Sequence, residues 1–321
     1  MRHRGILTAI FSAVILTSIC PALAWEIPSS VKVELVRVVT EDKATLNGAL
    51  FSPDPKVNPG PKLAILVTHG TGGSFYGGIN SFLPPLLAEK GYLGLSLNRR
   101  DAGHAYYRST FEDGIKDLKA GIDFLAAKGI TDVFLLGHSL GSTFVPYYMG
   151  MTNDSRVKLM GLSGAISDLR RATVETHLGS KQKYDQVVRE AKIKVEAGKG
   201  DEMFLVTLFG QVEALSYHTF LNYRGPDTHA IPIKWIPKIQ RPILLLHNTT
   251  DKQALVEWQE DLKKAGAGRL DYIEVTDPNP KHTPNEGHSY LGVELDVVRE
   301  VAGWLQKKGF VPAAPQRAAV R

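Results

Sequence analysis

The chain has 321 residues, an even composition and a formal net charge of +5, which exclude a disordered or fibrous protein. Its basic residues are interleaved with acidic ones, as in REAKIKVEAGKGDE (189–202), so the sequence predicts no nucleic-acid-binding surface. The length suffices for one large α/β domain or two smaller domains.

The N-terminus has the pattern of a secretory signal peptide. A basic start (Arg2, Arg4) precedes an apolar run over 6–19 and the small-residue end Ala22-Leu23-Ala24. A membrane span needs about 20 apolar residues, and this run has about 14. We therefore predict cleavage after Ala24, a secreted or periplasmic mature protein, and no stable membrane insertion. Cleavage also removes Cys20, the one cysteine, so no disulfide is expected.

The mature chain opens with two alternating segments, 31–39 and 44–51, which predict an antiparallel hairpin. Continuous apolar runs follow, each typical of a strand buried on both faces. These runs cover 62–70, 93–98, 132–139, 157–164, 242–248 and 270–275.

Helical patterns lie between the predicted strands. Residues 81–91 and 292–308 each end at or near a glycine, and 109–129 carries an apolar stripe with Thr110 and Asp113 as a candidate capping box. Alternation of strands and helices predicts an α/β fold with a mostly parallel, doubly wound sheet.

About 75 residues after the strand near Ser163 show no strand pattern, too many for an ordinary loop. A charged amphipathic helix is expected at 181–197, and we predict a mainly helical cap over the carboxyl ends of the strands. The predicted organisation is a signal peptide (1–24), a core in two parts (25–167 and 241–310), the inserted cap (168–240) and a loose tail (311–321).

Gly137-His138-Ser139-Leu140-Gly141 follows a predicted buried strand and precedes an apolar helix start. The pattern G-x-S-x-G in this setting is typical of a nucleophile elbow, in which the glycines allow neighbouring backbone to pass close to a strained serine. His138 is expected to be a packing residue. The motif predicts that Ser139 is a nucleophile.

A serine nucleophile needs a base, which a third group must orient. Asp251 follows the predicted strand at 242–248, and His288 lies in a loop before the last helix. We predict Asp251 as the orienting acid and His288 as the base, with Asp168 as the second choice for the acid and Asp277 less favoured. The alternatives are a helix N-cap for Asp251 and a surface-loop role for His288.

A tetrahedral intermediate needs backbone N–H donors. The residue after the nucleophile, Leu140, is one candidate. The glycine-rich loop His69-Gly70-Thr71-Gly72-Gly73 supplies the other, with Thr71 as first choice and Gly72 as second. A plain glycine turn is the alternative.

With the motifs HGTGG and GHSLG, and with Ser139, Asp251 and His288 in this chain order, the sequence resembles α/β-hydrolase-fold serine hydrolases of the lipase, esterase and serine-aminopeptidase kind over about residues 30–310. The resemblance implies hydrolysis of a small-molecule carboxylic ester through an acyl-enzyme, without a cofactor. A departure is the segment 276–288 before the histidine, which is longer than a tight connection.

Other functions fit less well. An amidase or aminopeptidase, a lactonase or an acyltransferase would use the same residues, and amine specificity would need acids such as Glu202 and Glu213 in the cap. A non-catalytic binding protein predicts a damaged triad. His247, His282 and His288 lack the spacing of a zinc site, so no metal is expected.

Aromatic residues of the chain are candidates for the mouth or wall of an acyl pocket, or alternatively for surface and cap core. They are Tyr106, Tyr107, Phe204, Phe209, Tyr217, Phe220, Tyr223 and Trp235.

Overall fold

The computed structural model describes residues 26–58, 60, 62–208, 211–278 and 287–312. The predicted signal peptide and most of the predicted tail therefore lie outside the described residues. Within the described ranges, none of the helices is long and apolar enough to cross a membrane.

An eight-stranded sheet forms the core, in the order β1-β2-β4-β3-β5-β6-β9-β10. β1 pairs antiparallel with β2, and β2 with β4, whereas all the remaining neighbours are parallel. The predicted hairpin and parallel strands are confirmed. The bounds are β1 (Lys32–Val39), β2 (Thr45–Ser52), β3 (Leu63–Thr68), β4 (Leu93–Leu97), β5 (Asp132–His138), β6 (Val157–Ser163), β9 (Ile243–Asn248) and β10 (Leu270–Val275).

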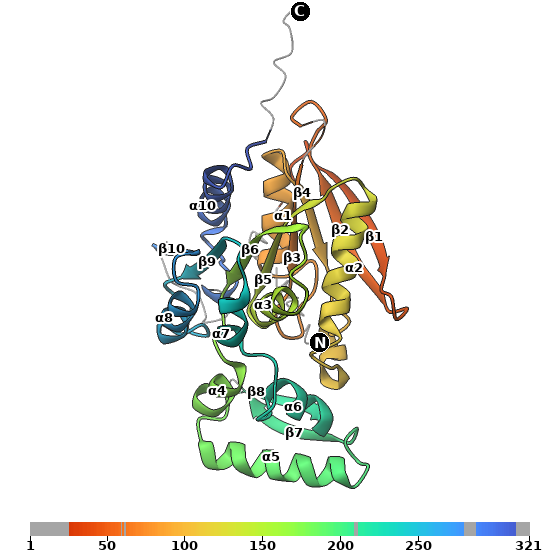
Figure 1. Ribbon diagram of the computed structural model, residues 1–321, viewed down its shortest axis with the longest axis vertical. Coiled ribbons are helices and arrows are strands. Elements are labelled where there is room, and N and C mark those ends of the chain that lie inside the picture. Colours follow the sequence, from red (N-terminus) through yellow and green to blue (C-terminus); the bar gives the residue numbers. More distant parts are fainter. Residues whose placement is uncertain (1–25, 59, 61, 209–210, 279–286, 313–321) are drawn as a thin grey trace, which may run out of the picture.

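Helices cover both faces of this sheet (Figure 1). α1 (Ile79–Glu89) and α10 (Glu294–Lys307) pack on one face, and α2 (Gly114–Ala127), α3 (Gly141–Thr152) and α8 (Val256–Ala265) on the other. Side chains of a strand point alternately to opposite faces, so successive residues of β3 pack under different helices. Ile65 and Val67 belong to the apolar cluster with α1 and α10, and Leu66 belongs to the cluster with α2 and α3. The doubly wound arrangement is thus as predicted.

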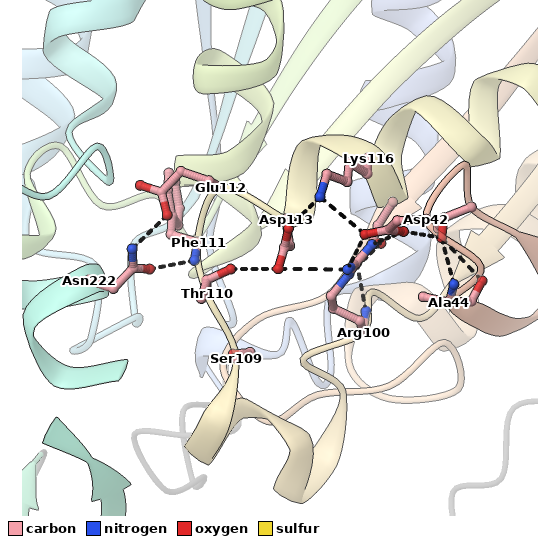
Figure 2. Close-up of polar contacts among 12 residues, drawn as sticks. Asp42, Ala44, Arg100, Ser109, Thr110, Phe111, Glu112, Asp113, Lys116 and Asn222 are labelled. Atoms are coloured by element: carbon pink, nitrogen blue, oxygen red, sulfur yellow. Dashed lines mark hydrogen bonds and ion pairs between the residues drawn. The ribbon is translucent and has the colours of Figure 1, made fainter. Parts of the chain in front are cut away.

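The start of α2 differs from the predicted capping box. Asp113 is the N-cap residue but makes no side-chain cap hydrogen bond; its carboxylate accepts from the Thr110 hydroxyl at 2.7 Å and pairs with Lys116. Figure 2 shows Lys116 and Arg100 converging on Asp42 of the β1–β2 turn. The Asp113 side chain therefore belongs to an ion-pair network that connects the β1–β2 turn to α2.

The cap lies between β6 and β9, and its residues 169–224 form the lower part of Figure 1. It contains α4 (Leu169–Ala172), a π-turn η2 (Thr173–His177), α5 (Lys181–Glu196), β7 (Met203–Leu208), β8 (Gln211–Ser216), α6 (Tyr217–Arg224), α7 (Pro232–Trp235) and a 3₁₀ turn η3 (Ile236–Lys238). The expectation that this segment has no strands is wrong, since β7 and β8 form an antiparallel hairpin. Alternating exposure, with Leu205 exposed and Val206 buried, shows the two-residue period of a strand.

One helix of the cap, α6, is fastened to the core segment 109–112. The Asn222 side chain accepts from the Phe111 N–H at 2.5 Å and donates to Glu112 at 2.6 Å (Figure 2). The Thr219 hydroxyl donates to the Ser109 carbonyl at 3.0 Å. These hydrogen bonds, two of them to backbone groups of the core, hold α6 against the segment 109–112.

Candidate active site

Ser139 lies directly after β5, at the carboxyl end of the sheet. Its φ of 54° is in the left-handed region, which non-glycine residues rarely occupy. The turn is held by a hydrogen bond from the Ser139 N–H to the Ser163 carbonyl, 2.8 Å long. A Cβ on Gly137 would collide with the Gly141 carbonyl, so the glycine is required where strand and helix meet. This is the strained strand-to-helix turn that the sequence predicts.

Asp251 and His288 come together from two loops 37 residues apart. The His288 Nδ1 and the Asp251 Oδ2 are 2.7 Å apart, and both residues are buried. Asp251 also accepts from the N–H groups of Gln253 (2.7 Å) and Ala254 (3.1 Å). Burial raises the pKa of the Asp251 carboxyl, but the hydrogen bonds from His288 and the two amides outweigh it, so that the pKa is lowered.

An ionised Asp251 can only accept, so Nδ1 of His288 donates and Nε2 is left with a lone pair. Nε2 is buried and has no hydrogen-bond partner among the described residues. The imidazole is therefore oriented and in the tautomer that a general base requires.

A cavity of about 790 Å³ contains both Ser139 and His288 in its wall. The core contributes His69, Gly70, Thr71, Gly73, Ser74, Gly77, Gly78, Asn80, Tyr106, His138, Ser139, Lys252, Gln253, His288 and Ser289. The cap contributes Thr176, Leu208, Gln211, Glu213 and Arg224. Ser139 and the oriented imidazole of His288 thus lie in the wall of one cavity, to which both the core and the cap contribute.

The glycine-rich loop after β3 passes directly over Ser139. A Cβ built on Gly70 would lie 2.8 Å from the Ser139 Cβ and 3.3 Å from its Oγ. Thr71 lies in the cavity wall, and Gly72 has a φ of +57°. His69 holds this loop, because its Nε2 accepts from the Arg99 N–H at 3.0 Å and its Nδ1 is 2.8 Å from the Gly70 carbonyl. Sequence reasoning missed the role of Gly70 as the point of closest approach.

A second histidine, His138, packs its ring against that of His288, with ring centroids 4.7 Å apart. Burial, followed by the repulsion between the two rings when both are protonated, lowers the pKa of His138 to about 3, so His138 is neutral. Its Nδ1 is 3.1 Å from the Ser163 hydroxyl, which in turn donates to the Tyr290 hydroxyl at 3.0 Å. Sequence reasoning did not find Ser163 or Tyr290, since neither belongs to a local motif.

The remaining predicted residues lie elsewhere. Asp168 caps α4 by accepting from the Arg171 N–H at 2.9 Å, so it is not the partner of His288. Glu202 pairs with Lys194, whereas Glu213 lies in the cavity wall. His282 and Phe209 lie outside the described residues. Within the described part of the chain, no cluster of three or more metal-ligating side chains is present.

Of the predicted aromatic residues, Tyr106 reaches the cavity wall. The other described cap aromatics pack among themselves or on the core: Phe204 stacks on Tyr217 with centroids 4.5 Å apart, and Trp235 packs on Tyr147 at 5.0 Å. None of these described cap aromatics is among the residues that line the cavity containing Ser139.

Comparison with known proteins agrees with this architecture. Residues 64–199 match a family model for the alpha/beta hydrolase fold. No curated protein matches the sequence significantly.

Solved structures with similar folds extend over most of the chain. The esterase domain of a Rhodothermus marinus protein is 17% identical, with a TM-score of 0.55, over 86% of this chain and 98% of that chain. Est1E from Butyrivibrio proteoclasticus is 16% identical, with a TM-score of 0.58, over 85% and 98%. The hypothetical protein PA2218 from Pseudomonas aeruginosa is 14% identical, with a TM-score of 0.67, over 88% and 95%. The chain is therefore an α/β-hydrolase-fold protein.

Proposed function

We propose that the protein is a serine hydrolase that cleaves carboxylic esters through an acyl-enzyme. Ser139 attacks the acyl carbon while His288 takes its proton, and His288 then gives that proton to the leaving alcohol. Water repeats the sequence on the acyl-enzyme and releases the acid. Asp251 orients the imidazole and stabilises its protonated form.

The observation that carries this proposal is the 2.7 Å contact between His288 Nδ1 and Asp251 Oδ2, in the wall of the cavity that also contains Ser139. Two loops distant in sequence thus meet to orient an imidazole, and a base oriented by an acid is what activation of a serine requires. A structural neighbour that is described as an esterase domain points the same way.

For the oxyanion, we propose the N–H groups of Leu140 and Thr71, with Gly72 as the alternative to Thr71. Support for Thr71 comes from the close approach of Gly70 to Ser139, because the next peptide group carries the Thr71 N–H. Thr71 also lies in the cavity wall.

The test is hydrolysis of p-nitrophenyl esters from acetate to dodecanoate by the full chain and by Ser139→Ala. The acyl length at which turnover peaks reports the size of the acyl pocket, and we expect turnover to fall by roughly 10⁴-fold or more in Ser139→Ala. Ser180→Ala is the matched control, since Ser180 caps α5 on the cap. A fluorophosphonate should label the full chain and Ser180→Ala, but not Ser139→Ala.

Turnover that persists in Ser139→Ala would overturn the assignment of the nucleophile. Labelling of Ser139 without turnover of any ester would move the substrate to amides, peptides or lactones.

We also propose that residues 1–24 direct export and are removed. Mass spectrometry of the protein recovered from a bacterial periplasm should show an N-terminus at Trp25, and an intact N-terminus would contradict this.

A further inference from the structure

One buried imidazole of the cavity wall, that of His138, has no role in the mechanism proposed above. His138 directly precedes Ser139 in the chain and lines the cavity together with Ser139 and His288. The centroid of its ring lies 4.7 Å from that of the His288 ring, with 42° between the ring planes. A second imidazole therefore lies beside both the proposed base and the proposed nucleophile.

A chain of hydrogen bonds determines which nitrogen of His138 carries the hydrogen. The chain ends at the Leu246 carbonyl, which can only accept, so the Tyr290 hydroxyl donates its one hydrogen there, at 2.9 Å. The Ser163 hydroxyl donates its own hydrogen to Tyr290 at 3.0 Å, and it therefore accepts from the His138 Nδ1 at 3.1 Å. In a neutral ring this leaves the hydrogen on Nδ1 and a lone pair on Nε2.

The lone pair of the His138 Nε2 has no partner in the protein. Burial, followed by repulsion between the two rings when both are protonated, lowers the pKa of His138 to about 3, so the ring is neutral at neutral pH. Its Nδ1 binds Ser163, whereas Nε2 makes no hydrogen bond to any described residue. Because buried polar atoms are generally paired, an acceptor of this kind in a cavity wall calls for a donor from water or substrate.

Gly164, directly after β6, allows both rings to approach one backbone position. Its φ is +51°, and a Cβ there would lie 2.9 Å from the Cε1 atoms of both His138 and His288. In each ring Nε2 is bonded to this Cε1, while Nδ1 is held by its own partner, Ser163 or Asp251. A water that donates to two acceptors spans about 4.5–5 Å between them, and the 4.7 Å separation of the ring centroids is of that size.

Hydrolysis of the proposed acyl-enzyme uses a water with two hydrogens. One hydrogen passes as a proton to the His288 Nε2 while the oxygen attacks the acyl carbon, and the other stays on the oxygen. We propose that the His138 Nε2 accepts a hydrogen bond from this second hydrogen and so positions the water that hydrolyses the acyl-enzyme. His288 then gives its proton to the Ser139 Oγ as the bond between Oγ and the acyl carbon breaks, and the acid leaves. The proposal rests on the hydrolase function proposed above and adds a residue to its second step.

A small alcohol separates this role from a purely structural one. Methanol has one hydroxyl hydrogen, which it gives to His288, and its methyl group cannot donate to His138. Loss of the His138 acceptor therefore slows hydrolysis of the acyl-enzyme more than methanolysis. Damage to the position of His288 or to the fold slows both reactions alike. The ratio of methyl ester to acid among the products thus reports the contact between His138 and water.

The experiment measures this ratio for the full chain with p-nitrophenyl butyrate at pH 7.5 and a fixed methanol concentration, after subtraction of the products formed with Ser139→Ala. In His138→Asn the amide nitrogen replaces Nδ1 as the donor to Ser163, and nothing replaces Nε2. We expect the ratio of methyl butyrate to butyrate to rise about tenfold. His138→Gln, whose amide oxygen can take the place of Nε2, should stay within about threefold of the parent ratio. His218→Asn, at an exposed position of α6, is the control and should keep the parent ratio.

Ser163→Ala tests the same contact with both rings in place. It removes the acceptor that holds the hydrogen on Nδ1, so part of the population carries the hydrogen on Nε2, and the ratio should rise about twofold or more. An unchanged ratio in both His138→Asn and Ser163→Ala would overturn the role of His138. A rise in His138→Gln equal to that in His138→Asn would assign the effect to loss of the ring and would overturn it too.

Failure of the hydrolase function gives a different result. A parent protein that releases no more p-nitrophenol than Ser139→Ala would overturn that function and, with it, the role of His138. Serine-dependent release of p-nitrophenol with an unchanged product ratio in the variants would overturn the role of His138 alone.

Discussion

At Gly70 a missing side chain controls how closely the loop after β3 approaches Ser139. In Gly70→Ala the new Cβ would lie 2.8 Å from the Ser139 Cβ, a distance that forces the loop and Ser139 apart. Loss of one oxyanion donor costs about 2.7–4 kcal/mol, so kcat should fall by roughly 10²–10³-fold. Steady-state kinetics on p-nitrophenyl acetate checks this, with a melting curve as evidence of folding. A folded Gly70→Ala protein with unchanged kcat would show that this loop does not contact the transition state.

The sequence predicts Asp251 and His288 because each lies in a loop after a predicted strand. It predicts Ser139 as the nucleophile from the G-x-S-x-G motif after a buried strand. Gly70 and Tyr290 could not be assigned in this way. Their roles depend on which backbone atoms approach them across the sheet, and no local pattern records that distance. For the same reason the sequence left Asp251, Asp168 and Asp277 as candidate partners of His288. The 2.7 Å contact identifies Asp251 as the residue that His288 binds.

Among the loops, the segment after His288 is held by the hydroxyl of Tyr290, a buried residue with a φ of 63°. This hydroxyl donates to the Leu246 carbonyl of β9 at 2.9 Å and accepts from the Ser163 hydroxyl and the Gly164 N–H. Tyr290→Phe would leave buried polar groups unsatisfied at about 1–3 kcal/mol each. Because the loop carries His288, we expect kcat to fall about tenfold or more, with a smaller change in KM.

Tyr92→Phe is the matched control for this substitution. The Tyr92 hydroxyl donates to the Phe310 carbonyl at 2.8 Å, and neither residue lines the cavity. It should lose stability by about 1 kcal/mol and keep its kcat. A Tyr290→Phe protein that loses stability but no kcat would limit Tyr290 to a structural role.

Two helical glycines should respond oppositely to alanine. Gly303 in α10 is exposed and a Cβ there meets no atom within 4 Å, so Gly303→Ala should stabilise the protein by about 0.5–1 kcal/mol. At Gly114, which begins α2, a Cβ would collide with the Phe144 ring, and Gly114→Ala should cost about 1–3 kcal/mol. Urea unfolding measures both. Equal effects would mean that packing at Gly114 relaxes freely.

The sheet and its helices could be predicted element by element, because buried parallel strands are continuous apolar runs bounded by turns. The hairpin β7–β8 was missed since its strands expose Met203, Leu205 and Val212 on one side and border the cap interior on the other. Each of these strands has six residues and lies among charged helical segments, so the alternation of apolar and polar residues is too short to be recognised. Tertiary packing against α6, by contacts such as Phe204 on Phe220, stabilises this hairpin.

For the molecule as a whole, the described contacts between cap and core combine aromatic packing, such as Tyr223 on Phe111, with buried polar groups. Asp101 pairs with Arg99 at 3.0 Å in the core, and the Tyr223 hydroxyl of α6 approaches the same carboxylate at 3.4 Å. Such groups must keep their charge states for the contacts to hold. The stability of the folded protein should therefore depend on pH through the buried titratable groups near this junction and near the site.

Three buried histidines set the sign of that dependence. Burial lowers the pKa of His69 to about 4 and of His138 to about 3, and it lowers the pKa of His177 well below its ordinary value. An unfolded histidine has a pKa of about 6.5, so between that pH and about 4 the unfolded chain binds protons that the folded chain does not. The free energy of unfolding therefore contains the full contribution of these histidines above about pH 6.5. It falls as the pH drops, by about 1.4 kcal/mol per pH unit for each histidine.

Asp117, whose pKa burial raises, acts in the opposite direction, but a single carboxyl does not offset three histidines. Urea unfolding at pH 7.5, 6.0, 5.0 and 4.5 should therefore show a free energy of unfolding that declines steeply below pH 6. His69→Gln retains a donor and an acceptor for the Gly70 and Arg99 contacts. In this variant the free energy of unfolding should decline less steeply with falling pH, by the contribution of about one proton. His104→Gln, at an exposed position, should leave the slope unchanged. A constant free energy of unfolding from pH 7.5 to 5 would mean that these rings are protonated in the folded protein, which their burial argues against.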